Sequence, residues 1–302
     1  MKAAVVSSFG THPRYADFPV PAPAGDHDMV IDVLAAGLHP RVRSQADGSH
    51  YTSTGELPLV PGIDGVGRGA DGLLRYFILP DTRAGAMADQ TVIDTRRSIV
   101  LPPGSDPIAV AAAMNPAMSC WVALRQRVPF QAGQDVLILG ATGNAGQMAV
   151  QIAKLLGADG GIPAGRLGQA AADADVVIDY LWGQPAATAM AAIVTGRADR
   201  GKPLTWIEIG SVAGAVAPVP SAALRAARLQ IVGSGQGSVS TRDILAELPA
   251  LAGEITRGTF GIGARPTPLA DVEQAWADAA RTTQRIVLTP QPEIPLRAPE
   301  EL

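Results

Sequence analysis

A short apolar run followed at once by a glycine-rich turn has the clearest chemical use of any segment in this sequence. Residues 136–139 read VLIL, residues 140–146 read GATGNAG, and apolar residues at helical spacing follow. Glycine lets backbone amides approach a ligand closely, and the start of a helix leaves its first N–H groups unpaired. A strand, turn and helix in this order suit the pyrophosphate of a dinucleotide, held by Ala141, Thr142, Gly143, Asn144, Ala145 and Gly146.

The same turn matches the G-x-G-x-x-G pattern with alanine in the first place. The chain contains 33 glycines, so the match alone would be weak, and a tight turn with a purely structural role is the alternative. About 20 residues further on, where a carboxylate would select NAD, the sequence has Arg166 instead. Because a guanidinium fits a phosphate, NADPH is favoured over NADH, with an ordinary solvated arginine as the alternative.

The elements around this turn alternate between strands and helices. Apolar runs that suit strands occupy 175–179, 204–209 and 229–233, and helical stretches lie between them. This alternation predicts an α/β fold with a parallel, doubly wound sheet. Residues 1–107 contain short apolar runs broken by Gly and Pro, which is typical of a β-rich domain, and that texture returns after residue 255.

Two domains of ordinary size account for the length of 302 residues. An alanine-rich helix begins near residue 108, and Pro116 predicts a break or bend in it. The changes of texture place residues 1–108 and 255–302 in one domain and residues 109–254 in the other. In the first of these, the stretch LVPGIDGVG at 59–67 predicts a close approach of backbone to a neighbouring segment.

Composition excludes several classes of protein. Hydrophobic residues make up 47% and charged residues 17%, an ordinary globular balance, and the formal charge of -4 provides no broad basic face for nucleic acid. A single cysteine, Cys120, can form neither an internal disulfide nor a cysteine-rich zinc site. The N-terminal apolar stretch is too short for a signal peptide, and no uninterrupted apolar run approaches the roughly 20 residues that span a bilayer. We therefore expect a cytoplasmic protein with no membrane or nucleic-acid partner.

Eight segments occur in an order that is characteristic of one family: MKAAVV (1–6), AAGLHP (35–40), LPLVPGIDGVGR (57–68), NPAMSCWVAL (115–124), VLILGATGNAGQMAVQIAKLLGA (136–158), VVIDYLWG (176–183), IEIGSVAG (207–214) and RIVL (285–288). With them the chain resembles the medium-chain dehydrogenase/reductase superfamily, and in particular its zinc-free quinone oxidoreductase-like branch. The resemblance implies that residues 1–108 and 255–302 form a GroES-like catalytic domain. It further implies that residues 109–254 form a Rossmann domain for NADP, with the active site in the cleft between the domains.

Zinc-using relatives carry a cysteine where this chain has His39, a histidine at Ile63, an acid at Asp64 and a further cysteine near Asn115. Only His39 and Asp64 could coordinate a metal here, whereas a catalytic zinc site ordinarily has three protein ligands. We therefore expect no zinc. Without a metal to polarise a simple carbonyl, conjugated substrates are favoured, so the expected reaction is hydride transfer from NADPH to a quinone or an α,β-unsaturated carbonyl.

The resemblance supplies candidate catalytic residues. Tyr51 is the preferred proton donor or oxyanion stabiliser, because relatives often carry a tyrosine in this loop, and a tyrosine that only packs over the cleft is the alternative. His39 takes the place of the lost cysteine and could hydrogen-bond substrate or ribose, or serve a structural role. Asp64 could be a polar turn residue.

Further cofactor-binding positions follow from the resemblance alone: Asn115, Ser119, Tyr180, Trp182 and Gly210. Trp182 could instead pack between the domains. Arg285 matches a position near the cofactor in relatives, although a surface arginine is the default interpretation. Cys120, which has no evident paired base, is interpreted as a buried small hydrophobe rather than a nucleophile.

One departure from the family pattern stands out. Only eight residues separate Arg166 from Asp175, where relatives fit a helix, a strand and another helix, so either the sheet lacks one edge or the chain omits a piece. A non-catalytic nucleotide-binding homologue therefore stays open as an alternative, as does an alcohol dehydrogenase of the same superfamily that uses His39 and Asp64. Relatives dimerise through the strand expected at 229–233, so we expect a homodimer.

Overall fold

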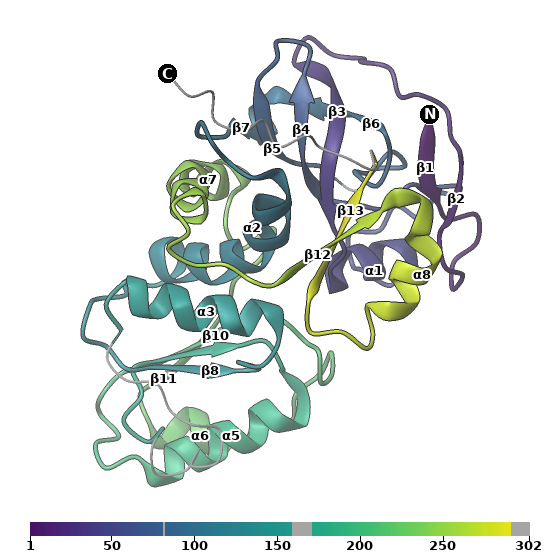
Figure 1. The fold of residues 1–302 in the computed structure, drawn as a ribbon. Helices are drawn as coiled ribbons and strands as arrows, with labels where there is room; N and C mark the ends of the chain where they lie inside the picture. Colours follow the sequence, from purple (N-terminus) through teal and green to yellow (C-terminus); the bar gives the residue numbers. More distant parts are fainter. Residues whose placement is uncertain (81, 159–170, 291–302) are drawn as a thin grey trace. The chain divides into compact units, whose positions relative to one another are not determined.

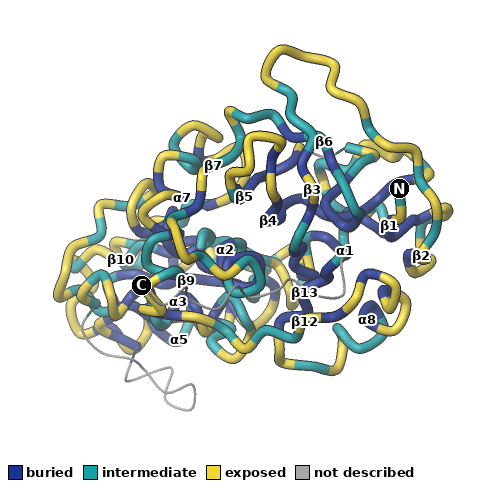
Figure 2. The backbone as a smooth tube through the Cα atoms, turned by 45° about the horizontal axis from the view of Figure 1, so that its top comes forward, coloured by how far each residue is buried: buried dark blue, intermediate teal, exposed yellow. Residues whose placement is uncertain are grey.

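The computed structural model describes residues 1–80, 82–158 and 171–290, and Arg166 lies outside these residues. The chain divides into two units, one of Met1–Asn115 with Ala252–Leu302 and one of Pro116–Leu251. Each unit has its own hydrophobic core. Strand β9 (Val176–Asp179) of the second unit and strand β13 (Arg285–Thr289) of the first are buried at every residue (Figure 2).

The first unit is built on a seven-stranded sheet in which most neighbours are antiparallel. Its strand order is β12 (Ala264–Pro268), β13, β3 (Asp28–Gly37), β4 (Asp64–Gly69), β5 (Leu74–Ile78) and β7 (Ser98–Val100), with β6 (Gln90–Asp94) also paired to β3 (Figure 1). Strands β1 (Lys2–Val5) and β2 (Arg14–Asp17) form a separate antiparallel pair. Helices α1 (Pro40–Ala46) and α8 (Val272–Asp278) and the short 3-10 turns Thr95–Arg97 and Leu269–Asp271 complete it.

Glycines in β4 let it lie very close to β3. A Cβ atom at Gly67 would collide with the side chain of Ile31 and lie 2.6 Å from the carbonyl oxygen of Asp32. A Cβ atom at Gly65 would lie 2.9 Å from the ring of Phe77. No side chain fits at either position without a shift, which explains the glycine-rich stretch in physical terms and agrees with the predicted close approach.

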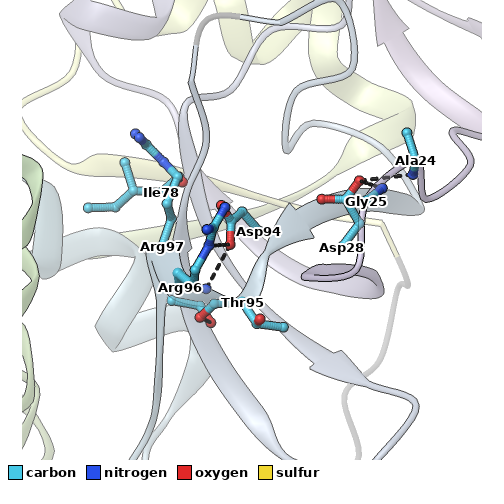
Figure 3. Close-up of polar contacts among 9 residues, drawn as sticks. Ala24, Gly25, Asp28, Ile78, Asp94, Thr95, Arg96 and Arg97 are labelled. Atoms are coloured by element: carbon cyan, nitrogen blue, oxygen red, sulfur yellow. Dashed lines mark hydrogen bonds and ion pairs between the residues drawn. The ribbon is translucent and has the colours of Figure 1, made fainter.

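Two aspartates fix one end of the β3–β6 pair (Figure 3). The carboxylate of Asp28 accepts hydrogen bonds of 2.9 Å from the backbone amides of Ala24 and Gly25, and so determines where β3 begins. Asp94, opposite Asp28 in the register, accepts from the backbone amide and the guanidinium of Arg96. These bonds to Arg96 lower the pKa of Asp94 to about 2.

The second unit contains a four-stranded parallel sheet in the order β11 (Leu229–Gly233), β10 (Leu204–Glu208), β9 and β8 (Val136–Leu139). Helix α3 (Asn144–Leu155) lies on one face, and α5 (Gly183–Gly196) and α6 (Ser221–Ala226) lie on the other (Figure 1). This is the doubly wound arrangement predicted from the sequence. The carboxyl ends of the strands share one edge, so Leu139, Asp179, Glu208 and Gly233 end on the same side of the sheet.

The sequence predicts a break or a bend at Pro116, and the structure shows no break there. Helix α2 (Pro107–Val122) runs through this proline and continues as a π-helical turn, Ala123–Arg127. Proline removes one backbone hydrogen bond from a helix, but Ala112, Ala113 and Ala117 on either side are at most 1% exposed. Their burial outweighs the lost bond. The 21 residues Pro107–Arg127 are long and apolar enough to cross a membrane, yet 67% of their most apolar stretch is buried inside the protein, as in a core helix. Helix α7 (Thr241–Thr256) likewise contains a proline, Pro249.

A buried arginine joins the chain on either side of helix α5. Nη1 of Arg197 donates to the carbonyl oxygens of Ala172 (2.7 Å) and Ala174 (2.8 Å). Nη2 donates to those of Lys202 (3.1 Å) and Pro203 (3.0 Å). The side chain is 3% exposed, so it satisfies four carbonyl oxygens that have little access to water. It thereby fixes the segments that lead into β9 and β10.

Replacing this arginine by lysine tests its structural role. Arg197→Lys keeps the charge but cannot reach four carbonyl oxygens in two directions, so we expect the free energy of unfolding to fall by roughly 2 kcal/mol. Urea denaturation followed by circular dichroism measures the change. Arg200→Lys, at an exposed position nearby, is the matched control and should change it by less than about 0.5 kcal/mol.

Candidate active site

The glycine-rich turn between β8 and α3 is preformed. Gly140 has φ of +91°, which reverses the chain after the strand, and its carbonyl accepts from the amide of Gly143. A Cβ atom at Gly146 would lie 2.6 Å from Cα of Ala141, so the helix packs directly onto the turn. The side chain of Gln147 closes it by donating to the carbonyl of Thr142 at 2.9 Å.

Gly143 has a different environment from the glycines around it. Only one heavy atom, the carbonyl oxygen of Gly140 at 3.6 Å, lies near the position of its missing Cβ. In the described part of the chain, the amides of Asn144, Ala145 and Gly146 donate to no other residue. Open space beside unpaired amides at a helix start fits a doubly anionic pyrophosphate. The shape and the unpaired amides of the turn therefore fit the pyrophosphate of a dinucleotide.

The end of β9 is held by a buried carboxylate that the sequence analysis did not single out. Asp179 accepts from the backbone amides of Leu181 (2.8 Å) and Trp182 (3.0 Å) and from the indole of Trp206 (2.9 Å). Trp182 has φ of +51°, and no other non-glycine residue among those described has a positive φ. Such strain persists only where the surroundings enforce it, and Asp179 does so here. Its charge and, above all, burial raise the pKa of Glu208 at the neighbouring strand end.

Three of the predicted cofactor residues come together beside this strand end. The hydroxyls of Ser119 and Tyr180 lie 2.8 Å apart, and the hydroxyl of Ser119 also donates to the carbonyl of Pro116. Burial raises the pKa of Tyr180 well above its ordinary value. The amide of Gly210 donates to the carbonyl of Asp179, and a Cβ atom there would lie 3.1 Å from the carbonyl oxygen of Tyr180. Asn115 lies one helical turn before Ser119 on α2.

The first unit contains a buried polar cluster made of His39, Asp64, Tyr76 and Arg285. Nε2 of His39 lies 2.9 Å from Oδ1 of Asp64, and the hydroxyl of Tyr76 donates to Oδ2 of the same carboxylate at 2.8 Å. His39 precedes α1, Asp64 opens β4 and Tyr76 lies on β5. All three side chains are at most 3% exposed. Burial lowers the pKa of His39 and raises that of Tyr76 well above its ordinary value.

Two default interpretations from the sequence are wrong. Asp64 is not a polar turn residue, because it lies in a strand and its carboxylate is buried. Arg285 is not a surface arginine, because it is 5% exposed and donates through Nη1 to the carbonyl of Leu38 at 3.0 Å. Burial lowers its pKa to about 10. Among the described residues its Nε has no hydrogen-bond partner.

Tyr51, the other predicted catalytic residue, lies outside this cluster. Its side chain is 76% exposed, and its ring stacks against that of His50 at a centroid separation of 4.2 Å. Sequence reasoning missed Tyr76, which lies within the apolar run LRYFI, because only the antiparallel register of β4 and β5 brings its hydroxyl to Asp64.

Cys120 lies in the core, as the sequence indicates. It is 0% exposed, and burial raises its pKa to about 12. Because the thiolate is the reactive form, we expect no reaction with a thiol reagent such as a disulfide of thionitrobenzoate in the native protein at pH 8. One thiol per chain should react after denaturation in guanidinium chloride. Rapid labelling of native protein would show that the helix around Cys120 opens readily.

Comparison with known proteins adds independent information. No protein-family model matches the chain. The probable NADPH-dependent quinone reductase tdiC of Emericella nidulans is 28% identical, over 96% of this chain and 100% of that protein. The quinone oxidoreductase of Homo sapiens is 30% identical, over 47% of this chain and 45% of that protein.

Solved structures share the whole fold. A mycobacterial quinone oxidoreductase superposes with a TM-score of 0.79 at 21% identity, over 96% of this chain and 100% of that one. The quinone oxidoreductase of Thermus thermophilus does so with a TM-score of 0.73 at 21% identity, with the same coverage. The chain has the medium-chain dehydrogenase/reductase fold. The resemblance to the quinone oxidoreductase-like branch and the predicted α/β fold class are both confirmed.

The chain differs from a zinc enzyme in its possible ligands and from the Emericella protein in its length. Within residues 1–80, 82–158 and 171–290, no three His, Cys, Asp or Glu side chains gather as a metal site would require. The alignment with the Emericella protein spans 359 positions, more than the 302 residues of this chain, so that protein carries residues that this chain lacks. The short spacing between Arg166 and Asp175 in the sequence predicts such a difference there.

Proposed function

We propose that the protein is an NADPH-dependent oxidoreductase that transfers hydride to a quinone or an α,β-unsaturated carbonyl without zinc. The observation that carries this proposal is the preformed turn at residues 140–146, with open space at Gly143 beside three unpaired amides. The names of the relatives support the reaction class: a probable NADPH-dependent quinone reductase, a quinone oxidoreductase and a trans-enoyl reductase of Aspergillus terreus.

The proposal assigns the cofactor to residues 109–254 and the substrate chemistry to residues 1–108 and 255–302, and the division of the chain into two units supports this assignment. The amides of Asn144, Ala145 and Gly146 would bind the pyrophosphate. Ser119, Tyr180, Trp182, Gly210 and Asn115 are proposed to line the nicotinamide end. When bound, NADPH supplies the hydride. Arg166 is proposed to pair with the additional phosphate.

Conjugated acceptors are favoured because the buried groups of the first unit stabilise negative charge without a metal. A hydride acceptor gains negative charge on oxygen, and hydrogen-bond donors or acids near that oxygen lower the barrier. His39 and Tyr51 are the proposed donors. Of the positions that hold zinc in zinc-using relatives, only His39 and Asp64 carry possible ligands, which favours the zinc-free reaction over a metal-dependent alcohol dehydrogenase.

Titration and turnover test the proposal together. Fluorescence titration should show tighter binding of NADPH than of NADH, and Arg166→Ala should weaken only NADPH. A screen of quinones and enones should then show oxidation of NADPH in samples from which zinc has been removed. Binding without any oxidation would favour the non-catalytic homologue, and activity that depends on stoichiometric zinc would favour the alcohol dehydrogenase.

We also propose that the protein is a cytoplasmic homodimer paired through β11. The support is that β11 has a neighbour, β10, on one side only among the described strands, which leaves an edge open to a second copy. Light scattering should give about twice the monomer mass of 31.1 kDa. A mass near the monomer value would contradict the proposal.

A further inference from the structure

We infer that His39 is the residue that exchanges a proton with the substrate oxygen, through its Nδ1 atom, and that Asp64 and Tyr76 are positioning residues that fix its tautomer. The inference rests on the proposed function for the identity of the substrate. The arrangement of the imidazole itself rests only on contacts within the first unit.

The hydrogen bonds of Asp64 determine which nitrogen of His39 carries hydrogen. A carboxylate only accepts hydrogen bonds, so the contact of 2.9 Å between its Oδ1 and Nε2 of His39 requires the hydrogen on Nε2. A neutral imidazole carries a single N–H, so Nδ1 has a free lone pair. No described residue donates a hydrogen bond to that nitrogen. The arrangement follows the same logic as a carboxylate that orients a catalytic histidine in a hydrolase.

The other members of the cluster are committed elsewhere. The hydroxyl hydrogen of Tyr76 points to Oδ2 of Asp64 at 2.8 Å, and burial holds the phenol in its protonated form. Both oxygens of Asp64 already have a donor. Nδ1 of His39 is therefore the atom of this relay that is left to meet a substrate. Tyr51, by contrast, is an exposed residue of a loop.

Burial and the charges around His39 determine whether its imidazole is more readily a proton donor or a proton acceptor. Burial, Arg285 on β13 and Arg41 on α1 lower its pKa, whereas Asp64 on β4 raises it. The uncharged Tyr76 on β5 completes the surroundings through Asp64. Burial is the largest of these effects, so the pKa of His39 is lowered and the neutral form of the imidazole is favoured. A neutral Nδ1 is prepared to take a proton from a hydroxyl, which gives the site a use in the oxidative direction as well.

His39 would exchange one proton with the substrate oxygen in each direction of the reaction. In reduction, a C–H bond forms with the transferred hydride, the substrate oxygen gains the electron pair, and the imidazolium gives that oxygen its Nδ1 proton and becomes neutral. Solvent then restores the proton. In oxidation, neutral Nδ1 would remove the hydroxyl proton of the reduced substrate, the electron pair on oxygen would re-form the conjugated carbonyl, and the C–H bond formed in reduction would break and give its hydride to bound NADP+. We therefore expect kcat/KM for quinone reduction to fall, and kcat/KM for the reverse oxidation to rise, as pH increases through the pKa of His39.

Nitrogen NMR tests the tautomer without any substrate. The chain has 4 histidines, and His39→Gln identifies the signals of His39 in protein labelled with 15N at histidine. We expect hydrogen on Nε2 and an unprotonated Nδ1 in the neutral imidazole, and a titration of His39 at lower pH than that of an exposed histidine. Tyr76→Phe removes one donor from Asp64, strengthens its charge toward His39, and should move this titration and both kinetic limbs to higher pH. Hydrogen on Nδ1 would overturn the inference.

Kinetics test the role. His39→Gln should lose at least about 100-fold in kcat for quinone reduction, while its affinity for NADPH stays within about twofold of wild type. The exposed His12 provides the matched control, because His12→Gln should leave kcat, the pH profile and the melting temperature unchanged. Unchanged kcat and pH profile in His39→Gln would overturn the inference while the proposed function stands. If none of the quinones or enones supports oxidation of NADPH by the wild-type protein, the proposed function fails. The NMR measurement still decides the tautomer of His39.

Discussion

Gly143→Val should fold normally and bind NADPH about 100-fold more weakly than wild type, a loss of roughly 2.7 kcal/mol. The φ of Gly143 is −77°, which any residue adopts, and the nearest atom to a new Cβ is 3.6 Å away, so the protein itself tolerates the side chain. The valine would instead occupy the space beside the amides of Asn144, Ala145 and Gly146. Fluorescence titration with NADPH measures the effect.

Two further variants make this result specific. Gly201→Val, at a turn before β10 on the opposite edge of the sheet, should leave NADPH affinity unchanged. Gly146→Val should lower the melting temperature as well, because even a Cβ atom there would collide with the backbone of Gly140 and Ala141. A folded Gly143→Val protein that binds NADPH as wild type does would contradict the assignment of this turn to the pyrophosphate, and the proposed redox role with it.

Asp179→Ala should lower the free energy of unfolding by roughly 3–5 kcal/mol. The variant leaves the amides of Leu181 and Trp182 and the indole of Trp206 without an acceptor, at a residue that is 0% exposed. Each buried donor without a partner costs about 1–3 kcal/mol. The strained backbone of Trp182 also loses the bond that holds it. Denaturation by urea, followed through tryptophan fluorescence, gives the value.

Asp179→Asn separates the contribution of the bonds to the backbone amides from that of the bond to the indole of Trp206. An asparagine oxygen can still accept from both backbone amides, but its NH2 group then faces the indole N–H of Trp206, so we expect a smaller loss than for alanine. Asp173→Ala, at an exposed position before β9, is the control and should be nearly neutral. A loss below about 1 kcal/mol for Asp179→Ala would show that water replaces the carboxylate.

Local patterns were sufficient to predict much of the fold. Three of the four residues at 136–139 are buried because strands of a parallel sheet are covered on both faces, and the tight turn that follows requires glycine at Gly140 and Gly146. A helix break at Pro116, one of the two predicted alternatives, does not occur, because local propensity cannot weigh the burial of the alanines around it. The resemblance to a family supplied the remainder, including Ser119 and Tyr180, which bond to each other.

The polar clusters could not be predicted from spacing. His39 and Asp64 are 25 positions apart, Tyr76 lies within an apolar run, and Arg285 belongs to the last strand, so only the sheet register brings them together. Asp179 and Trp206 are likewise joined across two parallel strands. In sequence such residues look like ordinary strand positions, because their pairing is a property of tertiary structure.

The clamp formed by Arg197 has a practical consequence for protein engineering. The guanidinium of Arg197 donates to the carbonyls of Ala172 and Ala174 and to those of Lys202 and Pro203. A residue that follows β9 in the sequence therefore fixes the segment that leads into it. Changes engineered at Arg197 would therefore disturb β9 as well as β10, although β9 comes before the arginine in the sequence.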